Sequence, residues 1–254
     1  MCLFWIILGH SFSIRVIDSE NWVSLDYQFL KFINLVPLGA FFAVDVFFLI
    51  GGFLLGYVFL TALKKNTYHI YLMGIVHRLL RFYPSYITAM LIWYQIFPQT
   101  GSGPFWPLQQ YFVDFCSTMW RNILFIDNLF VQISCMPWAW YLSNDVQLFV
   151  LCIGLLFIYT RWPKIAMGIS LALIVGSITF NFVVSQKEGY FVIAHVYDLF
   201  KWNDYFMKMY IKPWSRCPPY ILGLFLGIEY YKFFKYNKNK KEGILSEDET
   251  APLL

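Results

Sequence analysis

VPLGAFFAVDVFFLIGGFLLGYVFLTAL, residues 36–63, carries a single charged side chain, Asp45. A helix that crosses the hydrocarbon core of a bilayer needs about 20 mostly apolar residues. The segment therefore predicts a membrane-spanning helix that is long enough to tilt.

The same apolar character recurs along the whole chain. Of its 254 residues, 59% are apolar and 13% are charged, whereas a soluble domain carries about 25% charged residues. A water-soluble fold of this size would lack the charge to cover its surface. We predict an all-α protein, a polytopic transmembrane bundle of about six spans, at roughly 1–16, 36–63, 82–98, 137–160, 164–184 and 218–235.

The distribution of lysine and arginine predicts the orientation. The connection 64–81 contains four basic residues and no acidic one, and basic residues also follow the fourth and sixth spans. Because short basic loops stay in the cytoplasm, the loops 17–35, 99–136 and 185–217 are expected to face outward. Both termini are then cytoplasmic, in a multi-pass protein of the secretory pathway or the plasma membrane.

The two ends of the expected organisation differ in character. Residues 1–235 form the predicted transmembrane domain, and residues 236–254 are polar and are predicted to be a disordered cytoplasmic tail. Cys116 and Cys135 share one outward loop, where a disulfide is permitted, and both a bridge and two free thiols remain open.

Two broad classes of function are excluded by these patterns. The net charge of +4 is spread over short clusters between apolar runs, unlike the concentrated basic face of a nucleic-acid binder. The five cysteines show no metal-ligand spacing. We therefore expect neither a nucleic-acid partner nor a metal.

Ionisable residues inside spans are candidates for a functional site, because their burial in lipid is costly. His10, Asp45 and Asp145 lie at similar predicted depths, about 10–13 Å below the outward surface at 1.5 Å per residue, and Glu229 lies deeper. An imidazole next to a carboxylate can serve as a general base. A structural polar contact and an ion or proton path are the alternatives.

Arg78 and Arg81 are placed on the cytoplasmic side, before the third span. They are three residues apart and share one face of a helix, so they could hold a diphosphate such as that of coenzyme A. An anchor to lipid headgroups is the alternative. Glycines at 51–52, and at 223 and 227 in a G-x-x-x-G pattern, predict close helix approach.

Five ordered segments together resemble one family of membrane proteins, the acyltransferase-3 group, and within it the nose-resistant-to-fluoxetine-like branch. The segments are LFWIILGHSF at 3–12, VDVFFLIGGFLL at 44–55, HRLLRFYPSY at 77–86, CMPWAWYLSNDVQ at 135–147 and KPWSRCPPYILG at 212–223.

The resemblance implies transfer of an acyl group from acyl-CoA, as cosubstrate, to a hydroxyl of a lipid, sugar or other small acceptor. By this resemblance His10 would be the base, Asp45 and Asp145 its polar support, and Arg78 and Arg81 the contact to CoA. Arg216 would contact the acceptor or cap a loop. Membrane lipids, acyl-CoA and the hydroxyl acceptor are the expected partners.

The family pattern also includes about ten spans, an arginine about ten residues before the histidine, and a secreted domain ahead of the first span. The chain lacks these, so we expect a partial member of the family. The rival interpretation is a non-catalytic transporter or lipid-handling membrane protein that has lost transferase activity, in which the buried polar residues line a path.

Overall fold

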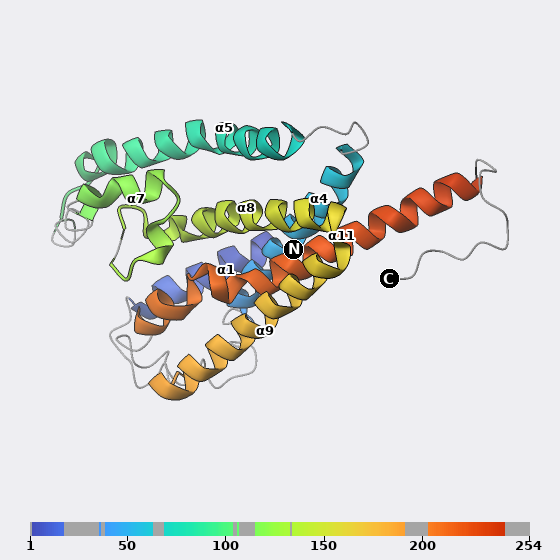
Figure 1. The fold of residues 1–254 in the computed structure, drawn as a ribbon. Coiled ribbons are helices and arrows are strands. Elements are labelled where there is room, and N and C mark those ends of the chain that lie inside the picture. The colour runs from blue at the N-terminus through green and yellow to red at the C-terminus, as the bar shows by residue number, and fades with distance from the viewer. Residues whose placement is uncertain are drawn as a thin grey trace. The chain divides into compact units, whose positions relative to one another are not determined.

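The structure is a computed structural model that describes residues 2–17, 36, 39–62, 69–103, 106, 115–132, 134–190 and 203–241. Long helices dominate these residues, and no strand occurs among them (Figure 1). The predicted all-α class is confirmed. The longer helices are α1 (Cys2–Ile17), α4 (Ala40–Ala62), α5 (His69–Leu91), α8 (Trp140–Arg161), α9 (Pro163–Glu188) and α11 (Pro213–Lys241). The shorter elements are η2 (Ile92–Ile96), η3 (Phe97–Gln99), η4 (Phe115–Thr118), α7 (Met119–Ile123), η5 (Asp127–Leu129), η6 (Pro137–Ala139) and η8 (Phe206–Tyr210).

The chain divides into two compact units. The first contains Met1–Val58, Phe191–Leu199 and Pro219–Leu254, and the second contains Phe59–Tyr190 and Phe200–Pro218. The boundaries fall inside α4 and α11, so each of these helices contributes to both units. Each unit is described by itself.

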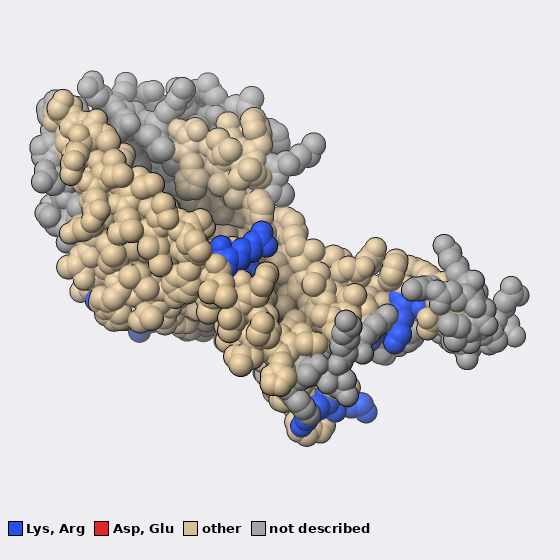
Figure 2. Space-filling view, turned by 90° about the horizontal axis from the view of Figure 1, so that it is seen from above, with Lys and Arg blue, Asp and Glu red and all other residues tan. Residues whose placement is uncertain are grey.

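Among the residues that the structure describes, three helices are long and apolar enough to cross a membrane, namely Ala40–Ala62, Pro137–Arg161 and Pro163–Glu188. They match the second, fourth and fifth predicted spans, whereas the predicted number of six is not confirmed. The other three predicted spans are helical but differ in extent: α1 has 16 residues, α5 starts 13 residues before residue 82, and α11 carries a basic end. On the face seen in Figure 2, lysine and arginine form a few small groups on a surface that is mostly uncharged.

The hairpin of α8 and α9 is set by local sequence signals. Pro163 occupies the first turn of α9, where its missing N–H costs nothing. Gly189 ends the same helix with a positive φ of 68° and donates its N–H to the Ser185 carbonyl, a glycine C-cap. The tight turn at Trp162 therefore reverses the chain, and α9 runs back from the end of α8 at an angle to it (Figure 1).

In the first unit, glycines bring α4 and α11 into backbone contact. A Cβ atom on Gly223 would lie 2.0 Å from the Leu49 carbonyl oxygen, and one on Gly52 would lie 2.0 Å from the Tyr220 carbonyl oxygen. No side chain fits such distances, so only glycine permits this approach. The predicted close packing is confirmed, and Gly56 and Gly227 extend it along the same two helices.

The carboxyl-terminal end of α11 departs from the predicted tail. The helix continues to Lys241, six residues beyond residue 235, where the predicted transmembrane domain ends. An ion pair between Lys232 and Glu229, 2.7 Å apart and three residues apart in sequence, stabilises the preceding turns. Residues 242–254 lie outside the described residues.

Replacement of Gly223 by leucine tests the contact between α4 and α11. The added side chain would meet the α4 backbone, and we expect the free energy of unfolding to fall by about 3 kcal/mol, the upper end for overpacking. The measurement is thermal unfolding of the detergent-purified chain. Gly168→Leu is the matched control, because a Cβ at Gly168 meets no atom within 4 Å. Equal stability of the two variants would contradict the close contact.

Candidate functional site

An ion pair in the second unit joins two of the predicted site residues. The Arg78 guanidinium on α5 donates to the Asp145 carboxylate on α8, with 2.5 Å between Nη2 and Oδ2. The guanidinium also lies over the Phe149 ring, 4.2 Å from its centroid. Asp145 and Phe149 are four residues apart on one face of α8. The arginine is therefore held by a charge and an aromatic face together.

Arg78 and Asp145 meet because α5 begins earlier than the sequence predicted. The sequence places Arg78 in a cytoplasmic connection and Asp145 in the outer half of the bilayer. Their direct contact shows that this separation is wrong. The helix begins at His69, so Arg78 lies in its third turn and faces α8. An apolar setting favours this arrangement, because a buried charge requires a partner.

The remaining predicted residues have different surroundings. Arg81 is exposed on α5, His10 is exposed on α1, and Asp45 is half-buried on α4. His10 and Asp45 belong to the first unit, whereas Asp145 belongs to the second. The pair of Arg78 and Asp145 brings two predicted site residues into direct contact.

Arg216 is buried at the start of α11 and caps the end of η8. Its Nε donates to the Tyr210 carbonyl oxygen over 2.8 Å, and its guanidinium lies 3.9 Å from the centroid of the Tyr210 ring. The sequence left two roles open for this residue, contact with the acceptor or capping of a loop, and these contacts are those of a loop cap.

A buried polar cluster, defined here as Asn128, Asn144, Gln147 and Lys212, was not predicted from sequence. Asn128 Nδ2 donates to Asn144 Oδ1 over 2.8 Å, and Gln147 Nε2 donates to Asn128 Oδ1 over 2.8 Å. Lys212 Nζ donates to the carbonyl oxygens of Asn128 and Phe130, over 2.7 and 3.1 Å. The available signal was the three-residue spacing of Asn144 and Gln147, which places both on one face of α8.

Burial shifts the pKa values of Lys212, in this cluster, and of Asp127, beside it. Burial raises the pKa of Asp127, although hydrogen bonds from Ser143 and Ser134 lower it in part. Burial also lowers the pKa of Lys212, and the Asp127 carboxylate partly offsets that effect. Both groups are thus shifted toward their neutral forms.

A disulfide fixes the segment that leads into α8. Cys116 and Cys135 are bridged, which decides between the two alternatives that the sequence left open. The bridge closes a loop of 19 residues, for which the chain-entropy model gives about 3 kcal/mol of stabilisation. Cys152 and Cys217 are buried free thiols. No group of three or more potential metal ligands occurs in the described part of the chain.

The fold and these contacts define an all-α membrane protein with buried charged and polar groups between its helices. The chain belongs to the acyltransferase-3 family, whose model, described as an acyltransferase domain, matches residues 1–245.

Two curated relatives from Caenorhabditis elegans show the extent of the similarity. The chain is 31% identical over 251 residues to "Nose resistant to fluoxetine protein 6", covering 88% of this chain and 30% of that protein. It is 23% identical over 259 residues to "Regulator of hypoxia-inducible factor 1", covering 89% of this chain and 49% of that protein. The chain thus spans half or less of the length of these relatives. No solved structure matches it.

Replacement of Asp145 by asparagine tests the ion pair. The Arg78 charge would remain in place without its counter-charge, and breaking a buried pair costs about 3–5 kcal/mol. We expect a correspondingly large fall in the melting temperature. Glu229→Gln is the control, because its pair with Lys232 is partly exposed and worth at most about 1 kcal/mol. Equal effects would show that the Arg78 pair adds no more than a surface contact.

Replacement of Lys212 by methionine tests the polar cluster. Two carbonyl oxygens would lose their donor, and an unsatisfied buried group costs about 1–3 kcal/mol. Thermal unfolding should report this loss. Lys208→Met should change stability little, because the Lys208 side chain is exposed and pairs with exposed Asp204.

Proposed function

We propose that this chain is a membrane O-acyltransferase that moves an acyl group from acyl-CoA to a hydroxyl acceptor. The observation that carries the proposal is the match of residues 1–245 to the acyltransferase family model. The ordered motifs that contain His10, Asp45, Arg78 and Asp145 lie within that match.

In the proposed mechanism His10 is the general base. Its imidazole removes the proton of the acceptor hydroxyl, and the oxygen attacks the thioester carbonyl of acyl-CoA. The C–S bond then breaks, and the imidazolium returns the proton to the leaving CoA thiolate, which balances the reaction. Asp45 and Asp145 remain proposed as polar support for this chemistry.

We propose different roles for the two arginines, Arg78 and Arg81. Arg78 is bound to Asp145 and stacked on Phe149, so we assign it a positioning role. Arg81 is exposed three residues later and is the better candidate for contact with a CoA phosphate.

A second candidate function is non-catalytic lipid handling. The specific observation that favours it is the ion pair of Arg78, because one of the two arginines proposed to hold CoA is already occupied by a carboxylate.

Binding of acyl-CoA separates the two candidates. We expect palmitoyl-CoA to raise the melting temperature of the detergent-purified chain, and Arg81→Ala to abolish most of the shift by removing a phosphate contact. Arg161→Ala is the control, since Arg161 is also an exposed arginine, at the end of α8. No shift in the folded wild type would refute the transferase proposal and favour lipid handling.

Loss of transfer in His10→Ala tests the base assignment. General base catalysis contributes about 10²–10⁴-fold, so transfer from radiolabelled palmitoyl-CoA should fall by that order while palmitoyl-CoA binding persists. His69→Ala, at an exposed histidine of α5, should retain activity. Full activity of His10→Ala would eliminate the assignment.

A further inference from the structure

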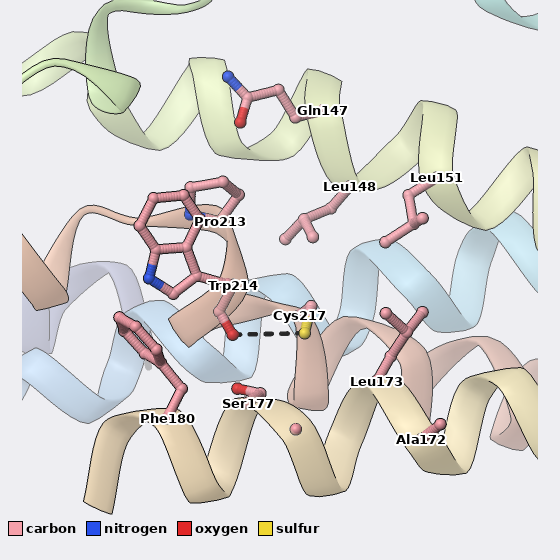
Figure 3. Close-up of a pocket in the computed structure, with 11 residues that line it drawn as sticks. Gln147, Leu148, Leu151, Ala172, Leu173, Ser177, Phe180, Pro213, Trp214 and Cys217 are labelled. Atoms are coloured by element: carbon pink, nitrogen blue, oxygen red, sulfur yellow. Dashed lines mark hydrogen bonds between the residues drawn. The ribbon is translucent and has the colours of Figure 1, made fainter. Parts of the chain in front are cut away.

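An apolar groove lies in the second unit between α8, α9 and the start of α11. Its volume is about 660 Å³, within the range of about 300–1,000 Å³ that ligand pockets occupy. Leucines from α8 and α9 form one end, and Phe180 and Trp214 form the other (Figure 3). The groove therefore has a purely aliphatic end and an aromatic end.

The aromatic end adjoins the buried polar cluster. Gln147 lines the groove and is hydrogen-bonded to Asn128 in that cluster. Pro213 and Trp214, which directly follow Lys212, also line it. A long molecule in the groove would thus have its apolar part beside leucines and one end beside polar groups, which is the pattern of a lipid.

Ser177 adds a polar group inside the groove. The residue is 4% exposed, and its hydroxyl has no oxygen or nitrogen hydrogen-bond partner among the described residues. It lines the groove beside Cys217 (Figure 3). Its contact with the Cys217 sulfur is weak and leaves the hydrogen-bonding capacity of the hydroxyl incomplete, and a hydroxyl or ester oxygen of a bound lipid would complete it.

The walls of the groove place it in the hydrocarbon of a bilayer. Both α8 and α9 are helices long and apolar enough to cross a membrane. Trp214 is 40% exposed, and tryptophan concentrates at the boundary between lipid tails and headgroups. The aliphatic end then lies deeper than the aromatic end.

The disulfide selects the side of the membrane from which the groove is filled. Cys116 and Cys135 precede α8 and are bridged, and disulfides persist on the oxidising side of a membrane. The beginning of α8, and with it the aromatic end of the groove, therefore faces away from the cytoplasm. None of the side chains that line the groove is basic, so none of them would hold the phosphates of CoA, and the occupant is the acceptor and not the acyl donor.

We propose that this groove binds a hydroxyl-bearing lipid of the non-cytoplasmic leaflet, with its hydrocarbon chain between α8 and α9 and its polar end at Trp214 and Ser177. The proposal rests on the transferase function, because it names the class of acceptor. It gives the chain a lipid alcohol as substrate in place of a sugar or a soluble alcohol.

Photocrosslinking tests the groove directly. The probe is a diacylglycerol with a diazirine in one acyl chain, incorporated with the wild-type chain into phosphatidylcholine nanodiscs. We expect crosslinks within residues 147–151, 172–180 and 213–217, and competition by unlabelled diacylglycerol. Labelling elsewhere, or equal competition by additional phosphatidylcholine, would overturn the proposal, because the groove would then show no preference for a hydroxyl lipid.

Gly176→Trp supplies the blocking variant. A Cβ at Gly176, which lines the groove, meets no atom within 4 Å, so the indole fills the groove without striking the backbone. Crosslinking should fall about tenfold, because the added indole overpacks the groove and excludes the acyl chain of the probe. Gly168→Trp is the matched control: it lies two turns earlier on α9, is equally open and does not line the groove. Unchanged crosslinking in Gly176→Trp would also overturn the proposal.

Transfer measured on the same samples separates this proposal from the transferase function. Specific crosslinking without transfer from palmitoyl-CoA would refute the transferase and the acceptor role, and leave lipid handling. Transfer to a hydroxyl acceptor that is unaffected by Gly176→Trp would keep the transferase and refute the groove as its acceptor site.

Discussion

The ion pair between Arg78 and Asp145 is the contact on which the arrangement of α5 and α8 depends. A lone charge on either helix would be costly among apolar side chains, and the opposite charge offsets part of that cost. The pair also fixes the rotation of α5, because Phe149 must lie beneath the guanidinium. For this reason, a residue that the family motif associates with substrate also has a structural role here.

Hydrogen bonds between buried polar groups also link distant segments of the second unit. Asn128 links α8, through Asn144 and Gln147, to the chain that enters α11, where Lys212 donates back to the Asn128 carbonyl. The disulfide between Cys116 and Cys135 fixes the segment that carries this cluster toward α8. The groove opens beside this framework, since Gln147 belongs both to the cluster and to the lining of the groove.

In the first unit, by contrast, α4 and α11 are held by backbone contacts at glycines. Removal of side chains at Gly52 and Gly223 lets the backbones approach and gain van der Waals contact, which is the main source of helix association in lipid. His10 and Asp45 belong to this unit, whereas Arg78, Arg81, Asp145 and Arg216 belong to the other. The residues of the proposed chemistry are thus distributed over both parts of the chain.

The sequence by itself determined the helical class, the three apolar spans, the glycine contacts and the family, because composition, period and motif order are local properties of the chain. It did not determine the start of α5 at His69, and it therefore misplaced Arg78, since apolar length alone does not locate the polar turns that extend a helix. Only the tertiary structure decided the partner of Arg78, the contacts of Arg216 with Tyr210, the bridge between Cys116 and Cys135, and the cluster around Asn128. Each of these depends on which groups from distant segments packing brings within hydrogen-bonding or bonding distance, and spacing along the chain carries little of that information.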